Sequence, residues 1–193
     1  MKKILLIGDS IRLGYQDAVR NILSETAVIT GPDVNCRFSS FTLFHLSKWV
    51  EDSDYDIIQW NNGQWDTCYM PDGKIHTPLP IYLEYQERIA SVLMTKTKRL
   101  VFATTTPVWP EMHTEIQLDY RKNEDIQKYN NSACSLLSKS GIEINDLYTP
   151  IATDIKKYIS DDMVHQNQEG NLLLSKHVVS MIGESKTSHL NNP

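Results

Sequence analysis

Short apolar runs alternate with longer amphipathic segments along most of this 193-residue chain. Apolar runs of strand length, and segments with apolar residues every three or four positions, predict strands and helices in alternation. We expect strands at 3–8, 55–60, 99–104 and 142–145, and one more at either 27–30 or 34–38. The expected helices cover 14–26, 42–50, 83–97, 123–140 and 168–182. Such an alternation forms right-handed βαβ units, so the sequence predicts a parallel sheet with helices on both faces.

The composition, 40% hydrophobic and 22% charged, is that of an ordinary globular protein. It excludes a disordered chain, a collagen-like fibre and a small disulfide-stapled protein. No internal repeat or change of composition marks a second domain. We therefore expect one three-layer α/β domain over 1–193, in which the polar residues 184–193 form a flexible tail.

The net charge of −5 and the lack of dense Lys and Arg clusters exclude a nucleic-acid partner and docking on an anionic membrane. The apolar run at 4–7 is too short for a signal peptide, and no run approaches the roughly 20 residues of a membrane span. A cytoplasmic location is the expectation. The cysteines form no CxxC pair and the histidines lack metal-ligand spacing, so no metal site is expected.

Reactive side chains are expected where the strands end, because an open parallel sheet gathers its site at the carboxyl ends of its strands. Ser10 follows the first predicted strand, beside a helix N-terminus whose N–H groups can stabilise an oxyanion. A nucleophilic serine needs a base, and the base needs an orienting carboxylate. Asp162 and His165, three residues apart just before the last helix, can supply both. Together the three predict a catalytic triad.

Each motif alone also has a simpler interpretation. Residues 8–10 can be a helix entry in which Asp9 or Ser10 is the N-cap. Asp162-x-x-His165 alone is typical of a solvated turn, and Asn61-Asn62-Gly63 of a turn with positive φ angles. Each motif falls at a strand exit or beside the final helix, and this joint placement favours the catalytic interpretation.

These motifs resemble those of the SGNH (GDSL-type) hydrolases. The resemblance rests on Ile7-Gly8-Asp9-Ser10, on 56–66 as a third block, and on Asp162-x-x-His165 followed by Glu169-Gly170. It spans nearly the whole chain. It implies a flavodoxin-like three-layer α/β/α sandwich with a parallel five-stranded sheet, in which Ser10 is the nucleophile, His165 the base and Asp162 its partner. It implies no metal or organic cofactor.

The sequence departs from the family pattern where the oxyanion donors are expected. The third block is usually Gly-x-Asn-Asp, but Trp65 stands at the asparagine position of Gly63-Gln64-Trp65-Asp66. The candidate donors are therefore the Ser10 N–H, the side chains of Asn61 and Asn62, and the Trp65 indole. The glycine of the second block is missing too, and the turn at 37–40 is its expected replacement.

The predicted function is ester hydrolysis through an acyl-enzyme, with a small-molecule ester as the substrate. Small acyl groups on carbohydrates are preferred, because the loop aromatics Trp65, Tyr69 and Trp109 suit sugar faces. The long connection at 66–83 is a possible lid. The alternatives are hydrolysis of short-chain lipid or aryl esters, a flavodoxin-like or receiver-like binding module, and a hydrolase-like fold that has lost its activity.

Overall fold

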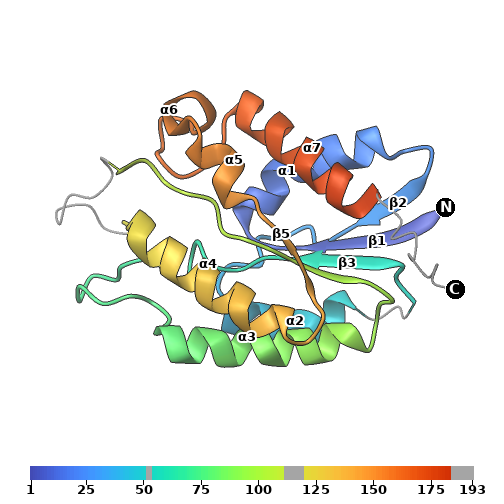
Figure 1. The fold of residues 1–193 in the computed structure, drawn as a ribbon, viewed down its shortest axis with the longest axis horizontal. Helices are drawn as coiled ribbons and strands as arrows, with labels where there is room; N and C mark the ends of the chain where they lie inside the picture. Colours follow the sequence, from blue (N-terminus) through green and yellow to red (C-terminus); the bar gives the residue numbers. More distant parts are fainter. Residues whose placement is uncertain (51–53, 111–119, 184–193) are drawn as a thin grey trace, which may run out of the picture.

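A parallel five-stranded sheet forms the centre of the molecule in the computed structural model, which describes residues 1–50, 54–110 and 120–183 (Figure 1). Its strand order is β2-β1-β3-β4-β5, and each neighbouring pair is parallel. This is the flavodoxin-like order, whose direction changes between β1 and β3. The strands are β1 (Lys2–Ile7), β2 (Ala27–Thr30), β3 (Ile57–Trp60), β4 (Leu100–Ala103) and β5 (Glu143–Asn145).

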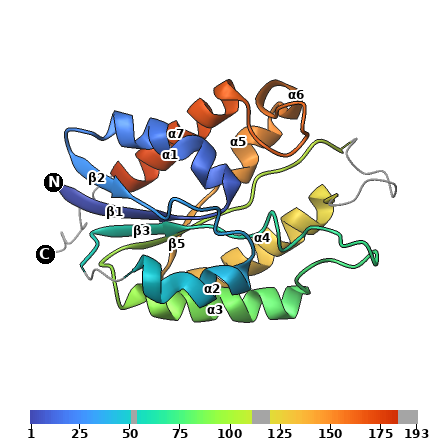
Figure 2. The ribbon, with the colours of Figure 1, turned by 180° about the vertical axis from the view of Figure 1, so that it is seen from behind.

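Helices cover both faces of this sheet, which confirms the predicted α/β/α sandwich. One layer contains α1 (Ser10–Ile22), α5 (Tyr148–Ala152), α6 (Ile155–Tyr158) and α7 (Gln168–Gly183). The other contains α2 (Ser39–Trp49), α3 (Leu79–Met94) and α4 (Asn123–Ser138). Figures 1 and 2 show these layers above and below the strands. No helix in the described part of the chain has both the length and the apolar character needed to cross a membrane.

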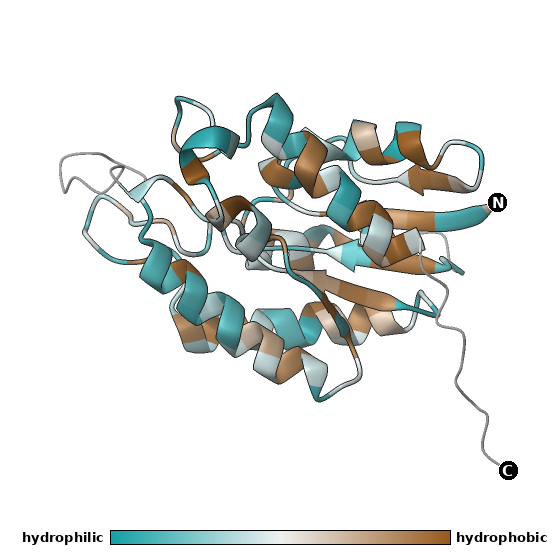
Figure 3. Ribbon diagram, turned by 45° about the horizontal axis from the view of Figure 1, so that its top comes forward, coloured by the Kyte–Doolittle hydropathy of each residue, from teal (hydrophilic) through white to brown (hydrophobic). Residues whose placement is uncertain are grey.

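The core has two halves because successive residues of each strand point to opposite faces. Leu5 and Ile7 of β1 pack towards α2, α3 and α4, while Ile4 and Leu6 pack towards α1 and α7. A strand that is buried on both faces consists of consecutive apolar residues. Residues 4–7 of β1 form such a run. Figure 3 shows the central strands coloured mostly as hydrophobic residues, between helices of mixed colour.

The element boundaries differ from the predicted ones mainly at helix starts. Helix α1 begins at Ser10 rather than at residue 14, because the Asp9 side chain caps it by accepting from the Ile11 N–H at 3.0 Å. Helix α3 begins at Leu79, since a proline is compatible with the first helical turn. The second strand is 27–30, and 34–38 is a loop. The short helices α5 and α6 lack the apolar periodicity that predicts longer helices, and the predicted tail at 184–193 lies outside the described residues.

Candidate active site

Ser10 is the first residue of α1, immediately beyond the exit of β1. The turn into the helix requires a glycine at position 8, since a Cβ atom there would lie 2.0 Å from Asn61 Oδ1. Asp9 caps the helix, and the Ser10 side chain remains partly exposed at the N-terminal end. Strand β1 and helix α1 thus place a hydroxyl group at the carboxyl edge of the sheet, within the favourable field of a helix N-terminus for an anion.

Asp162 organises the turn that precedes α7. Its Oδ1 accepts from the backbone N–H groups of Val164 at 2.9 Å and His165 at 2.8 Å, and from the Ser160 hydroxyl at 2.8 Å. The Ser160 N–H donates to the His165 carbonyl oxygen at 2.8 Å, which closes the turn. Met163 adopts a left-handed conformation with φ of 68°. These bonds fix the direction in which the imidazole of His165 projects.

The three predicted residues form one continuous chain of hydrogen bonds. The Ser10 hydroxyl lies 2.7 Å from His165 Nε2, and His165 Nδ1 lies 2.6 Å from Asp162 Oδ2. Because a carboxylate only accepts, Nδ1 carries the proton that it donates to Asp162, and Nε2 of the neutral ring is left to accept from Ser10. The fold therefore brings together residues 155 positions apart in the sequence.

Asp162 stays ionised in this arrangement. Partial burial favours its neutral form, but the N–H groups of Val164 and His165, with the side chains of His165 and Ser160, lower the pKa of Asp162 to about 2. About half of the Asp162 and His165 side-chain surfaces is exposed, so a small molecule can approach the imidazole from solvent. The result is a hydroxyl, an imidazole and an ionised carboxylate in series.

Arg12, which the sequence analysis did not single out, is completely buried beneath this site. Its Nη2 donates to the carbonyl oxygens of Gly8 at 3.3 Å and Val34 at 2.8 Å, and its Nη1 donates to Gln16 Oε1 at 2.7 Å. Burial raises the pKa of the neighbouring Asp9, although the Ile11 N–H, Asn61, Arg121 and Arg12 act in the opposite direction. Arg12 thus ties the exit of β1 to the loop that follows β2.

The side chains predicted as oxyanion donors differ in their contacts and exposure. Asn62 Nδ2 donates to the Arg37 carbonyl oxygen at 3.1 Å and to Thr42 Oγ1 at 2.9 Å, so the Asn62 amide is directed towards the second block. The Asn61 side chain lies against Gly8 and hydrogen-bonds with the Asp9 carboxylate. Trp65 is about one third exposed.

The turn at 37–40 has no glycine, but one of its residues has a backbone conformation typical of glycine. Arg37 has φ of 50°, a left-handed conformation that few residues other than glycine adopt. Its N–H donates to Asn35 Oδ1 at 2.8 Å, and the Ser39 N–H donates to the Asp66 carboxylate at 3.1 Å. The N–H of Phe38 lies between these two engaged groups.

The loop aromatics Tyr69 and Trp109 make different contacts. Tyr69 stacks on Tyr120 with ring centroids 4.4 Å apart, and its hydroxyl donates to Asp125 Oδ2 at 2.8 Å. The backbone N–H of Trp109 donates to the Met163 carbonyl oxygen at 3.0 Å, so the Trp109 backbone lies beside the Asp162–His165 turn. In the predicted lid at 66–83, the Thr77 N–H donates to the Asp66 carbonyl oxygen at 3.0 Å, and residues 79–83 belong to α3.

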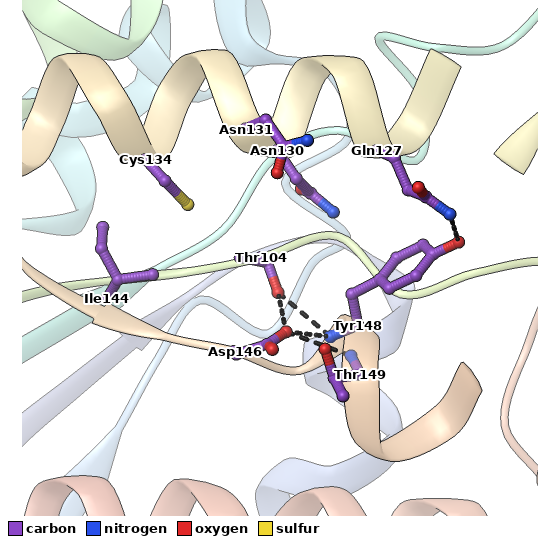
Figure 4. Close-up of a pocket in the computed structure, with 9 residues that line it drawn as sticks. All are labelled: Thr104, Gln127, Asn130, Asn131, Cys134, Ile144, Asp146, Tyr148 and Thr149. Carbon is purple, nitrogen blue, oxygen red and sulfur yellow. Dashed lines mark hydrogen bonds between the residues drawn. The ribbon is translucent and has the colours of Figure 1, made fainter. Parts of the chain in front are cut away.

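A separate cavity of about 200 Å³ lies beside β5, between α4 and α5 (Figure 4). Asp146 Oδ1 accepts from the Thr104 hydroxyl and from the backbone N–H groups of Tyr148 and Thr149 at its floor. Gln127 Nε2 donates to the Tyr148 hydroxyl at 2.6 Å at one end. No triad residue lines this cavity. Within 1–50, 54–110 and 120–183, no group of His, Cys, Asp and Glu side chains is arranged to hold a metal ion.

Several solved structures of other proteins share the fold of this chain. No protein-family model and no curated protein matches the sequence. Among solved structures, a lipase/acylhydrolase from Enterococcus faecalis is 20% identical, with a TM-score of 0.77 over 94% of this chain and 95% of that one. A lipolytic G-D-S-L family protein from Veillonella parvula is 17% identical, with a TM-score of 0.75 over 96% and 100% of the two chains. A catalytic mutant of an acetylxylan esterase from Geobacillus stearothermophilus is 16% identical, with a TM-score of 0.74 over 95% of each chain. The chain therefore has the fold of the GDSL-type hydrolases.

Proposed function

We propose that this protein is a serine ester hydrolase that works through an acyl-enzyme. The observation that carries the proposal is the hydrogen-bonded series Ser10–His165–Asp162, with distances of 2.7 Å and 2.6 Å. It lies at the carboxyl edge of a parallel sheet in a fold shared with a lipase/acylhydrolase and an acetylxylan esterase. The geometry supplies a nucleophile, a general base and the group that orients that base.

The reaction follows from these positions. Ser10 Oγ attacks the ester carbonyl carbon while His165 Nε2 takes the hydroxyl proton, and Asp162 stabilises the resulting imidazolium. The tetrahedral intermediate collapses as the carbon–oxygen bond to the alcohol breaks and Nε2 returns the proton to the leaving oxygen. Water then attacks the acyl-enzyme with His165 again as base, and this step releases the acid and restores Ser10.

The oxyanion requires donors on the side of Ser10 opposite the imidazole. We assign this role to the backbone N–H of Ser10, the side-chain amide of Asn61 and the N–H of Phe38. Asn61 is favoured over Asn62 because its side chain lies against Gly8, two residues before Ser10, whereas the Asn62 amide donates to Arg37 and Thr42. Phe38 is favoured within its turn because the N–H groups on either side of it already have acceptors. Trp65, with its ring partly in solvent, is the remaining sequence candidate.

The preferred substrates are small acyl groups, above all acetyl groups, on carbohydrates. The observation that supports this choice is that an acetylxylan esterase shares the fold. Trp109 contacts the turn that carries His165, and Trp65 and Tyr69 lie in the segment that follows β3. We propose Trp109 as an aromatic contact for the substrate.

A serine-directed probe tests the proposal directly. The wild-type protein should hydrolyse p-nitrophenyl acetate and should be labelled by a fluorophosphonate at Ser10, as located by peptide mass spectrometry. Ser10→Ala should lose both properties, whereas Ser91→Ala, a change at an exposed position on α3, should keep them. Labelling that persists in Ser10→Ala would show that the nucleophile is a different residue.

A further inference from the structure

Two buried glutamines, Gln64 and Gln166, take no part in the hydrogen-bonded triad. Gln166 directly follows His165 and is 6% exposed, and Gln64 lies in the segment after β3 and is 1% exposed. The Nε2 atom of each side chain has an acceptor, but neither Oε1 has a hydrogen-bond partner among the described residues. A buried amide oxygen without a donor destabilises a fold, and an apolar side chain of similar length avoids that cost. The two glutamines therefore need an explanation other than stability.

Both glutamines donate to Thr106, just beyond the end of β4. Gln64 Nε2 lies 2.7 Å from the Thr106 carbonyl oxygen and 3.2 Å from Thr106 Oγ1. Gln166 Nε2 lies 3.2 Å from the same Oγ1. Thr106 is itself 1% exposed, so solvent does not compete for these contacts. The Thr106 hydroxyl oxygen thus connects the segment that follows β3 with the turn that carries His165.

The turn that carries His165 is held together by its own hydrogen bonds. Asp162 accepts from three groups of the turn and from the imidazole. These bonds orient the ring within the turn, but they do not fix the turn relative to Ser10, which belongs to α1. A displacement of about 1 Å between reacting groups costs about 10²-fold in rate. Contacts that hold the turn against the sheet therefore matter for catalysis.

Residues after β4 hold this turn in two ways. The backbone N–H of Trp109 donates to the Met163 carbonyl oxygen at 3.0 Å, a contact that backbone atoms alone provide. The hydrogen bond from Gln166 to Thr106 depends on the two side chains. Because Gln64 donates to the same oxygen, this second contact also sets the turn relative to the segment that contains the candidate oxyanion donors.

We propose that Thr106 is a positioning residue for the esterase reaction, whose hydroxyl oxygen holds the turn of His165 where Nε2 meets Ser10 Oγ. The proposal rests on the proposed function for the reaction, and on the three hydrogen bonds at Thr106 for the position of the turn. It also accounts for the buried glutamines, whose Nε2 groups are needed at Thr106 although their Oε1 groups have no donor.

Thr106→Val tests this role, because valine keeps the branched shape of threonine and lacks the hydroxyl oxygen. We expect kcat for p-nitrophenyl acetate to fall about 10–100-fold while KM stays close to that of the wild type. Thr106→Ser restores the hydroxyl and should regain most of the lost kcat. Thr104→Val is the matched control, since Thr104 is 6% exposed and its Oγ1 accepts instead from the N–H groups of Leu147 and Tyr148 (Figure 4). This control should lower the melting temperature and leave kcat unchanged.

Nitrogen NMR of the imidazole gives a readout that does not need an active esterase. In Thr106→Val, the Nδ1–H signal of His165 should keep its chemical shift, because the bond to Asp162 lies within the turn. The Nε2 shift should move towards its value in Ser10→Ala, because the hydrogen bond from Ser10 Oγ weakens. Thr104→Val should change neither shift.

A second variant covers the case in which Thr106→Val does not fold. Gln166→Met removes the donor on the other side of the contact, together with the Oε1 atom that has no donor among the described residues, and should give the same kcat loss and Nε2 shift. A kcat or an Nε2 shift that stays at the wild-type value in the folded variant would overturn the proposal, as would equal kcat losses in Thr104→Val and Thr106→Val. A wild-type protein without esterase activity, in which the Nε2 shift still responds to Thr106→Val, would contradict the proposed function and support the positioning of His165.

Discussion

The Asp66 carboxylate holds the N-terminus of α2 through Ser39. Both of its oxygens lie 3.1 Å from the Ser39 backbone N–H, and Oδ1 accepts from the Ser39 hydroxyl at 2.6 Å. Both residues are completely buried; Ser39 begins α2, whereas Asp66 lies in the segment that follows β3. The contact fixes the turn at 37–40 relative to the exit of β3, and thus relative to the candidate oxyanion donors. Burial raises the pKa of Asp66 to about 6, although the Ser39 hydrogen bonds act in the opposite direction.

This raised pKa predicts a pH-dependent stability. Between its value in the unfolded chain, 3.8, and about 6, folded Asp66 binds more protons than unfolded Asp66 does. The free energy of unfolding should therefore fall as pH rises through this window, by about 3 kcal/mol in total. Asp66→Asn removes the titration, so the difference in unfolding free energy between wild type and variant should change across pH 4–7. Urea denaturation measures this difference. Asp72→Asn, at an exposed position, is the control, and parallel pH profiles for wild type and Asp66→Asn would contradict the prediction.

The sequence predicts the sheet and the triad but not the buried polar contacts between loops. A strand buried on both faces leaves a local apolar signal, and Asp162 and His165 are close enough in sequence to be recognised as a pair. Ser39 and Asp66 are 27 residues apart, and Arg12 and Val34 are 22 apart. Such contacts depend on how the loops pack, and no periodicity encodes them. The sequence signal for a buried polar contact at Arg12 is a charged residue on the face of α1 that also buries Ile11 and Tyr15.

The triad residues should act as one unit. Proton transfer from Ser10 to His165 is a single event, so removing either partner removes the same step. We expect His165→Ala to lower kcat for p-nitrophenyl acetate nearly as much as Ser10→Ala, and the double variant to lose little more. Circular dichroism checks that each variant is folded. Losses that multiply in the double variant would show that the two residues act independently.

Asp162→Asn tests whether the Asp162 carboxylate orients the imidazole of His165. Asparagine offers an amide N–H where Oδ2 now accepts from His165 Nδ1, so the wrong tautomer is favoured and kcat should fall by about 10⁴-fold. The lowered pKa gives a second readout. The ionised Asp162 stabilises the fold above pH 4, and this contribution is lost as pH falls through about 2. The difference in unfolding free energy between wild type and Asp162→Asn, measured by urea denaturation, should therefore become smaller from pH 4 to pH 2. A kcat within tenfold of wild type would rule out the orienting role.

Arg12→Lys should destabilise the fold although it keeps the charge. Lysine cannot reach Gly8, Val34 and Gln16 together, and it leaves buried carbonyl oxygens without donors. We expect a loss of about 2–4 kcal/mol in the free energy of unfolding by urea. Arg20→Lys, on the exposed side of the same helix, should change stability by no more than about 0.5 kcal/mol. Equal effects at the two positions would mean that the buried network contributes nothing.

Loss of the Asn61 side chain should lower kcat, whereas loss of the Asn62 side chain should lower stability. Asn61 lies next to Asp9 and Gly8, where a donor can face the oxyanion, so Asn61→Ala should lower kcat about 10²–10³-fold with a near-normal KM. The Asn62 amide binds Arg37 and Thr42 instead, so Asn62→Ala should mainly cost stability, by about 1–3 kcal/mol. Trp65→Phe, which removes only the indole N–H, should change neither kcat nor the melting temperature. Steady-state kinetics and thermal unfolding on all three variants separate these effects. A large kcat loss in Trp65→Phe alone would move the donor to the indole, and one in Asn62→Ala without destabilisation would move it to Asn62.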